Sequence, residues 1–157
     1  MYKIVVYKNF EKLKDIIDFD ENMSLEYIYE ILGLNICIEE YKKRHKKVFM
    51  DLFNLSEENF FIVALDDDRI VGLLWMGIRI DTVTYEKICY IYDIEIEKDY
   101  RNKGIGTSLI KKGFEICRNN NIRKMALMTD IMNKSALKWY MKLGFRISRF
   151  YLIKSDL

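Results

Sequence analysis

A basic turn interrupted by glycines, Arg101-Asn102-Lys103-Gly104-Ile105-Gly106, has the residue types needed to bind an anion. The first amides of the helix predicted to follow it point outward without intrahelical partners, so they carry partial positive charge. A pyrophosphate can accept several of these N–H groups if the backbone comes close, and Gly104 and Gly106 carry no obstructing side chain. Arg101 and Lys103 add positive charge, the arginine in a fork geometry suited to phosphate oxygens. The turn therefore predicts a phosphate cradle.

Two well-known phosphate loops do not fit this turn. The dinucleotide fingerprint requires a Gly or Ala three positions after its second glycine, where this chain has Leu109. The P-loop ends in Gly-Lys-Ser/Thr, and neither Gly106-Thr107 nor Gly113-Phe114 matches that ending. Both alternatives fail on spacing.

A second motif follows about thirty residues later, Asn133-x-x-Ala136-x-x-x-Tyr140-x-x-x-Gly144-Phe145. Ala136, Tyr140 and Leu143 share one face of a predicted helix, and Gly144 stands where a left-handed residue would end it. Taken with the Arg-x-x-Gly-x-Gly turn, this motif resembles the GCN5-related N-acetyltransferase (GNAT) superfamily. The resemblance extends over about residues 60–153.

The resemblance implies that acetyl-coenzyme A is the co-substrate, that its pyrophosphate lies on the turn, and that no metal takes part. The residues it assigns to the co-substrate are Ile94, Ile96, Arg101, Asn102, Lys103, Gly104, Ile105, Gly106, Thr107, Asn133 and Tyr140. It also implies that two parallel strands splay apart around the pantetheine arm. The implied activity is transfer of an acetyl group to a primary amine by direct attack in a ternary complex.

Two carboxylates on a predicted strand, Asp93 and Glu95, are candidates for the general base. They stand two positions apart and so share a face of the strand. A lysine-like amine of pKa about 10.4 must be lowered by about 3.4 pKa units, or roughly 4–5 kcal/mol, to be neutral at pH 7. A base, a water relay or desolvation must supply the free energy that makes the amine neutral. Asp93 is favoured over Glu95, although either could be a structural carboxylate, and Tyr92 stands where some relatives place a glutamate.

Tyr140 is the candidate general acid, because its phenol could protonate the departing thiolate from the helix. The alternative is a core aromatic at helical spacing. The oxyanion that forms on the thioester carbonyl would be bound by the backbone N–H of Ile96 or its neighbour.

The sequence also suggests three other interpretations. A non-catalytic acyl-coenzyme A sensor would keep the cradle but lack an acceptor site. A nucleic-acid site is suggested by the basic run at residues 42–47, but this run lies between the apolar positions Tyr41 and Val48 and reads as a solvated helix face. His45 lies on the apolar stripe and is predicted to be structural. Within the enzyme interpretation, the acceptor could be a polyamine, another small amine, a peptide N-terminus or a lysine.

The elements that must position these residues follow from hydrophobic periodicity. Strands are expected at residues 2–7, 60–65, 70–80, 87–96, 123–129 and 146–155, the last one closing the sheet. Helices are expected at residues 10–19, 25–32 and 36–53, after Gly106, and around Ala136 and Tyr140. This order predicts an α/β fold, a mixed twisted sheet with helices on both faces, in which the strand before Gly104 and the strand after its helix form a right-handed βαβ unit.

Length and composition fit one domain spanning residues 1–157, with a formal net charge of +2. No apolar run approaches the roughly 20 residues that span a bilayer, so no membrane partner is expected. Cys37, Cys89 and Cys117 show no C-x-x-C spacing and read as unpaired, buried small hydrophobes in a reducing cytoplasm. Assembly into a homodimer is left open.

Overall fold

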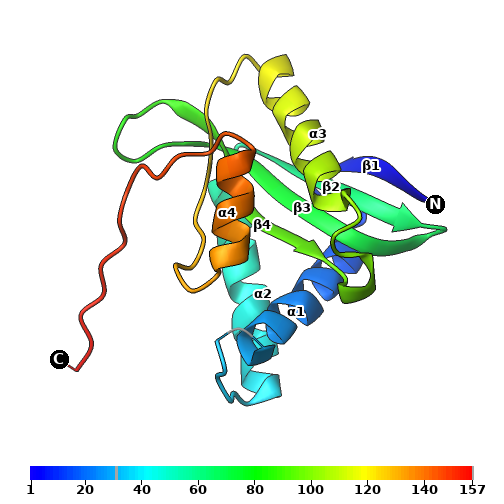
Figure 1. The fold of residues 1–157 in the computed structure, drawn as a ribbon, viewed down its shortest axis with the longest axis vertical. Coiled ribbons are helices and arrows are strands. Elements are labelled where there is room, and N and C mark those ends of the chain that lie inside the picture. The colour runs from blue at the N-terminus through cyan, green and yellow to red at the C-terminus, as the bar shows by residue number, and fades with distance from the viewer. Residues whose placement is uncertain (31, 157) are drawn as a thin grey trace.

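The computed structural model describes residues 1–30 and 32–156, which fold into a five-stranded sheet with helices on both faces (Figure 1). The elements are β1 (Tyr2–Lys8), α1 (Leu13–Glu30), α2 (Ile38–Leu55), β2 (Glu58–Asp66), β3 (Arg69–Ile80), β4 (Lys87–Ile96), a 3-10 turn (Lys98–Tyr100), α3 (Ile105–Asn119), β5 (Met125–Leu127) and α4 (Lys134–Lys142). The predicted mixed α/β architecture is confirmed.

The strands follow one another across the sheet in chain order, β1-β2-β3-β4-β5. The first four pair antiparallel, and β5 pairs with β4 in parallel. A tight turn with Asp67 at φ 53° joins the antiparallel strands β2 and β3. The two central strands are buried along most of their length, and this explains their nearly continuous apolar sequences.

Each face of the sheet has its own hydrophobic core. On one face α3 packs Leu109 and Ile110 against β2, β3 and β4, and α4 lies on the same side. On the other face α1 and α2 cover an aromatic cluster in which Phe49 stacks on Trp75 with ring centroids 4.1 Å apart. Burying a large apolar side chain completely contributes about 1.5–3 kcal/mol, so both layers hold the sheet.

The two short helices predicted near the N-terminus are wrong, because residues 13–30 form the single helix α1. Its buried positions are Ile16, Asp20 and Met23, at i, i+4 and i+7. The stripe is therefore continuous, but its middle member is an aspartate, which interrupts the apolar pattern in the sequence. The predicted range extended to residue 32, and Ile31 lies outside the described residues.

A bulge in β4 changes which face of the sheet the following side chains point to, and it sets the direction of Asp93 and Glu95. Trp75 pairs with Asp93 and Met76 pairs with Ile91, so Tyr92 is an extra residue in the ladder. Before the bulge Ile91 faces the α3 core, whereas after it Ile94 packs against that core. Strict alternation would have put Asp93 on the α3 face; the bulge directs Asp93 and Glu95 toward α1 instead.

The parallel pair β4 and β5 separates after three residues. The ladder joins residues 89–91 of β4 to residues 125–127 of β5 and stops there, although β4 continues to Ile96. From Tyr92 onward, this edge of β4 faces no strand among the described residues. The splay that the resemblance implied is thus present, and β5 is shorter than the predicted strand at residues 123–129.

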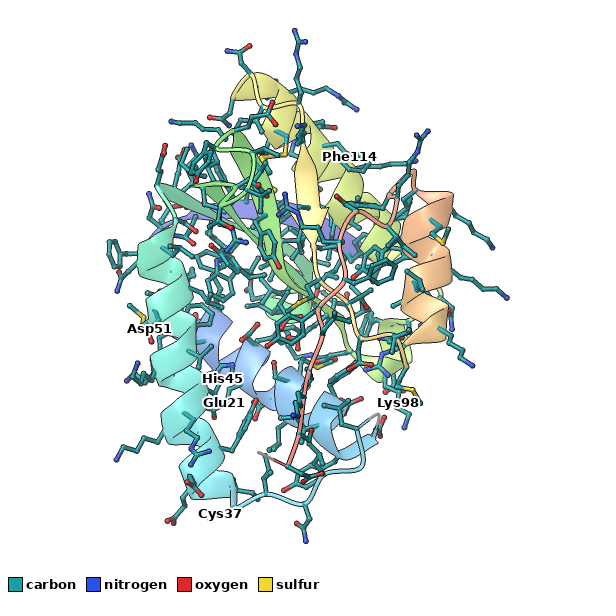
Figure 2. All side chains as sticks on the ribbon, turned by 90° about the vertical axis from the view of Figure 1, so that its left-hand side faces the viewer. Glu21, Cys37, His45, Asp51, Lys98 and Phe114 are labelled. Atoms are coloured by element: carbon teal, nitrogen blue, oxygen red, sulfur yellow. A yellow bond between two sulfur atoms is a disulfide. The ribbon has the colours of Figure 1, made fainter. Side chains whose placement is uncertain are left out.

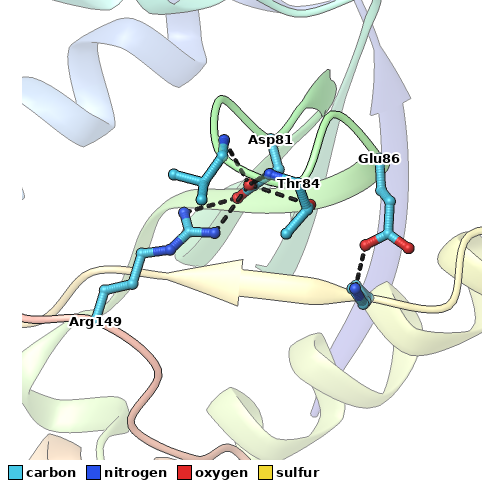
Figure 3. A network of polar contacts seen from close by, with 6 residues as sticks. Asp81, Thr84, Glu86 and Arg149 are labelled. Carbon is cyan, nitrogen blue, oxygen red and sulfur yellow. Dashed lines mark hydrogen bonds and ion pairs between the residues drawn. The ribbon is translucent and has the colours of Figure 1, made fainter.

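The predicted closing strand at residues 146–155 is wrong. After α4 the described chain contains no further strand, and Phe150 and Leu152 are exposed, in a segment that extends away from the body of the molecule (Figure 1). The physical reason is that β5 offers a sheet edge only three residues long. The segment is held instead by Arg149, whose guanidinium donates to both carboxylate oxygens of Asp81 at 2.8 and 2.9 Å (Figure 3).

The cysteine prediction is partly wrong. Cys89 in β4 and Cys117 in α3 are buried, as expected, but they are paired with each other as a disulfide, with Cα atoms 6.2 Å apart. Cys37 precedes α2 and is exposed, not buried. Within the described part of the chain, none of the helices combines the length and the apolar character needed to cross a bilayer.

Candidate active site

The backbone at the start of α3 forms an open cradle. Gly104 is the N-cap residue and has φ 81°, a left-handed conformation that side chains disfavour. A Cβ added there would meet nothing within 4 Å, so the space in front of the first amides of α3 is free. This geometry fits a pyrophosphate, which needs close approach to unpartnered N–H groups.

Gly106 lines the cleft and also has a packing role. A Cβ at this position would lie 3.1 Å from the ring of Trp139 in α4. The indole N–H of Trp139 also donates to Thr107 Oγ1 at 3.3 Å. Gly106 therefore allows α4 to pack closely against the first turn of α3, and Gly104 is the residue that leaves the cradle open.

The two basic residues of the turn are placed differently from one another. The Arg101 side chain folds back, donating from Nε to the carbonyl of Ile96 at 2.8 Å and from its guanidinium to Glu26 at 2.9 Å. It thereby ties the turn to the end of β4 and to α1. The ammonium of Lys103 lies 5.3 Å from the ring centroid of Tyr100.

A cleft of about 2800 Å³ runs along the open edge of β4, lined by residues of α1, α2, β4, β5, α4 and the start of α3. Every residue predicted to bind the co-substrate or to act in catalysis lines this cleft except Lys103. Asn133 stands at its far side as the N-cap of α4, where its side chain accepts the N–H of Ala136 at 3.2 Å. The cleft thus brings the two sequence motifs together.

Three carboxylates meet on the α1 side of the cleft. Asp20, Asp93 and Glu95 each place an oxygen within 4.8 Å of the others, a spacing that could hold a cation. Glu95 accepts a hydrogen bond from Ser24 Oγ at 3.2 Å, while its second oxygen is buried without a partner among the described residues. Asp93 accepts the N–H of Ile94 at 2.8 Å. We name this group the acid cluster.

Burial and mutual repulsion keep protons on the acid cluster. Burial, followed by the charge of Asp20, raises the pKa of Asp93 to about 8. Burial and the charges of Asp93 and Asp20 raise the pKa of Glu95 well above its usual value. Burial raises the pKa of Asp20 too, although the hydrogen bond between Asp20 and His45 opposes this. Such shifts in a cleft are typical of functional carboxylates.

Tyr140 projects from α4 and is 7 % exposed. Burial, and then the charges of Asp93 and Tyr27, raise the pKa of its phenol above the ordinary value, so it stays protonated at neutral pH. Its ring packs edge-on against Phe145 with centroids 5.7 Å apart. A neutral phenol on the side of the cleft opposite α1 can donate a proton.

Several residues of the acceptor side were missed by the sequence analysis: Asp20, Ser24, Tyr27, Tyr41 and His45. The signal that could have found Asp20 was its place on the buried stripe of α1, where a carboxylate requires a partner. His45 was predicted to be structural, and it is buried against Asp20. Figure 2 shows it on α2, next to α1.

The sequence profile of the Acetyltransferase (GNAT) family matches residues 25–145. N-alpha-acetyltransferase 30 of Schizosaccharomyces pombe is 33 % identical over 137 residues, which cover 85 % of this chain and 89 % of that protein. An uncharacterised protein of Bacillus subtilis, YxbD, is 36 % identical over 101 residues; the match covers 64 % of this chain but only 58 % of that protein. A solved structure from Pyrococcus furiosus, itself provisionally described as an acetyl transferase, superposes with a TM-score of 0.85 at 32 % identity, covering 98 % of this chain and 100 % of that one.

The chain therefore belongs to the GNAT acetyltransferase family. The predicted family and fold are confirmed, and so is the predicted enzyme class, an N-acetyltransferase. Acetyl-coenzyme A is the acetyl donor used in this family, and the open cradle at Gly104 fits its pyrophosphate.

Proposed function

We propose that this protein transfers the acetyl group of acetyl-coenzyme A to a cationic primary amine by direct attack in a ternary complex. One observation carries the proposal: the open edge of β4 separates a phosphate cradle on the α3 side from an acid cluster on the α1 side. A thioester that lies along this edge would meet an amine that enters from the acid cluster.

The co-substrate would be bound mainly by backbone groups. Its pyrophosphate would lie on the amides after Gly104, its pantetheine arm in the splay beside Ile94 and Ile96, and its remaining contacts would come from the turn and from Asn133. The N–H groups along the open edge of β4 are suited to bind the thioester carbonyl as it becomes an oxyanion.

The acid cluster supports removal of a proton from the amine. An ordinary aspartate, of pKa about 3.9, lies about 6.5 pKa units below an alkylammonium of pKa about 10.4. With the pKa of Asp93 raised to about 8, that gap narrows to about 2.4 units. For the ionised form of Asp93, which predominates above pH of about 8, accepting the proton is therefore far less uphill. Asp93, with Glu95 beside it, is the proposed general base.

Tyr140 is the proposed general acid. After the amine attacks the thioester carbon, the C–S bond breaks and coenzyme A leaves as a thiolate of pKa about 8.5. The phenol of Tyr140, kept neutral by burial, can protonate this thiolate. Its closeness to Asp93 supports this role, because base and acid then act on the same tetrahedral intermediate.

The acid cluster favours an acceptor that arrives as an ammonium ion, but it does not distinguish a small amine from a peptide. The similarity to N-alpha-acetyltransferase 30 supports a peptide α-amine. The cleft has a volume of about 2800 Å³, which accommodates either class of acceptor. Both classes therefore enter the test.

The first experiment measures thiol release from acetyl-coenzyme A with two acceptor pools, one of small amines including polyamines and one of peptides with free N-termini or lysines. Release with one pool and not the other would identify the acceptor class. Binding of acetyl-coenzyme A without release in either pool would contradict the proposal and favour the non-catalytic sensor. The Tyr140→Phe variant distinguishes enzymatic release from spontaneous hydrolysis.

A further inference from the structure

Asp20 and His45 form a buried pair behind the acid cluster. Asp20, in α1, is 3 % exposed, and its Oδ2 lies 2.7 Å from Nε2 of His45, in α2. The imidazole packs between Tyr41 and Phe49, with ring centroids at 5.7 and 6.2 Å. Both residues are thus held in place by two helices, and His45 also lines the cleft.

Structural support alone does not explain this pair. Asp20 Oδ1 and His45 Nδ1 are buried without a hydrogen-bond partner among the described residues. Leaving a buried polar atom unpaired costs roughly 1–3 kcal/mol, and more if it is charged. Native proteins rarely keep such atoms without a use, and here both belong to a pair that adjoins a catalytic cleft.

Among the described residues, the lysine and arginine side chains nearest the acid cluster are already paired with other acids. The titratable groups facing it are Asp20, Glu21, Glu26 and Tyr27 of α1, Tyr41 and His45 of α2, Asp93 and Glu95 of β4, and Tyr140 of α4. Glu21 is paired with Lys42 at 3.3 Å, and Glu26 with Arg101 at 2.9 Å. For Asp93 and Glu95 the described residues supply no ion pair.

We propose that Asp20 and His45 are a proton relay, which takes up the proton that the acceptor amine loses to Asp93 or Glu95. This inference rests on the proposed function. In the first step an N–H bond of the ammonium breaks and an O–H bond forms on Asp93 or Glu95. Asp20 starts protonated on Oδ2, and this hydroxyl donates to Nε2 of neutral His45. The proton from Asp93 or Glu95 binds Oδ1 of Asp20 while the Oδ2 proton moves to Nε2, so His45 becomes the imidazolium. One proton has moved from substrate to His45; Asp93 or Glu95 is again ionised, and Asp20 again carries one proton.

The first test follows the imidazole directly, because His45 is the sole histidine in the sequence. NMR signals of the ¹⁵N-labelled ring are recorded against pH in wild type, Asp93→Asn and Asp20→Asn. A relay predicts that the His45 signals respond to the ionisation of Asp93, so the wild-type titration has an additional step near the pKa of Asp93 that is absent from Asp93→Asn. Superimposable wild-type and Asp93→Asn titrations would overturn the relay.

The second test uses the pH profile of kcat/KM. Asp20→Asn keeps the shape of the side chain but cannot carry a proton, so kcat is expected to fall about 10-fold with the KM for acetyl-coenzyme A unchanged. Where Asp20 is ionised its charge raises the pKa of Asp93, so in Asp20→Asn the acidic limb moves to lower pH. Phe53→Leu perturbs the same hydrophobic core at a residue whose aromatic partners are Phe10 and Phe61, and serves as the control, expected to lower stability alone.

The outcomes separate the relay from the proposed function. Coupled titration of His45 without thiol release from any acceptor would reject the acetyl-transfer function and leave the coupling as a property of the cluster. Thiol release with an uncoupled His45, or an Asp20→Asn profile identical to that of Phe53→Leu, would reject the relay alone. Both measurements are made on the full chain.

Discussion

The two sides of the β4 edge are built in different ways. The proposed co-substrate side consists of a glycine-containing turn and the helix that directly follows it, so the groups proposed to bind are backbone amides of adjacent residues. The acceptor side consists of side chains from α1, α2 and β4, contributed by Asp20, His45, Asp93 and Glu95. The comparison teaches that the donor site is local in sequence and the acceptor site is not. Donor binding and acceptor chemistry should therefore be separable by mutation.

The largest expected effect is on the donor side. Gly104→Asp places a side chain and a negative charge in the cradle and should weaken acetyl-coenzyme A binding by more than about 10²-fold, as measured by calorimetry. Gly33→Asp is a matched control, because Gly33 also has φ above zero and open space around its Cβ position. If Gly104→Asp bound the co-substrate as well as Gly33→Asp, the cradle would be misassigned.

The second largest expected effect is the loss of the proposed proton donor, which should lower kcat and leave the binding of acetyl-coenzyme A intact. Tyr140→Phe removes the proton donor and is expected to lower kcat about 10²-fold, with the dissociation constant of acetyl-coenzyme A nearly unchanged. Tyr2→Phe is the control, since its hydroxyl pairs with Ser108 at 3.3 Å, away from the acid cluster. An unchanged kcat in Tyr140→Phe would remove this phenol from the mechanism.

The acid cluster should make stability depend on pH. The folded-state pKa of Asp93, about 8, exceeds the unfolded value of about 3.9, so between these values the folded state retains a proton that the unfolded state loses. Stability should therefore fall as pH rises through this range. Asp93→Asn removes the effect, and its melting temperature relative to wild type should rise by about 3 °C or more from pH 5 to pH 8. A constant difference across that range would show that Asp93 ionises normally.

The smallest expected effect concerns Asp81, a carboxylate whose pKa is lowered, whereas that of Asp93 is raised. Arg149 and the backbone N–H groups of Thr84 and Val83 lower the pKa of Asp81. Its stabilising contribution is therefore present above pH of about 4 and lost as pH falls through the lowered value (Figure 3). Asp81→Asn should change the melting temperature little at neutral pH. It should release the segment after α4 and accelerate its cleavage by trypsin at Arg146 and Lys154. Equal cleavage rates would mean that Arg149 does not anchor this segment.

Sequence reasoning succeeded where the structure is local. The cradle before α3, the left-handed Gly144 after α4 and the extent of β4 each depend on residues close together in the chain. Turn chemistry and helical spacing act over such short ranges, so the residue types alone indicate them. These features were sufficient to identify the family, and they predict which side of the site receives the co-substrate.

The remaining features were decided by tertiary packing. The bulge at Tyr92 directs Asp93 and Glu95 to the α1 face of the sheet instead of the α3 face. The residue types in this strand do not predict such a bulge. Asp20 became a functional candidate only when α1 packed against α2 and brought His45, 25 residues away in the chain, within hydrogen-bond distance. The sequence by itself determined the fold, the family and the donor cradle, because these depend on local patterns. Only the tertiary structure determined the acid cluster, because proximity of charges from separate elements sets their protonation.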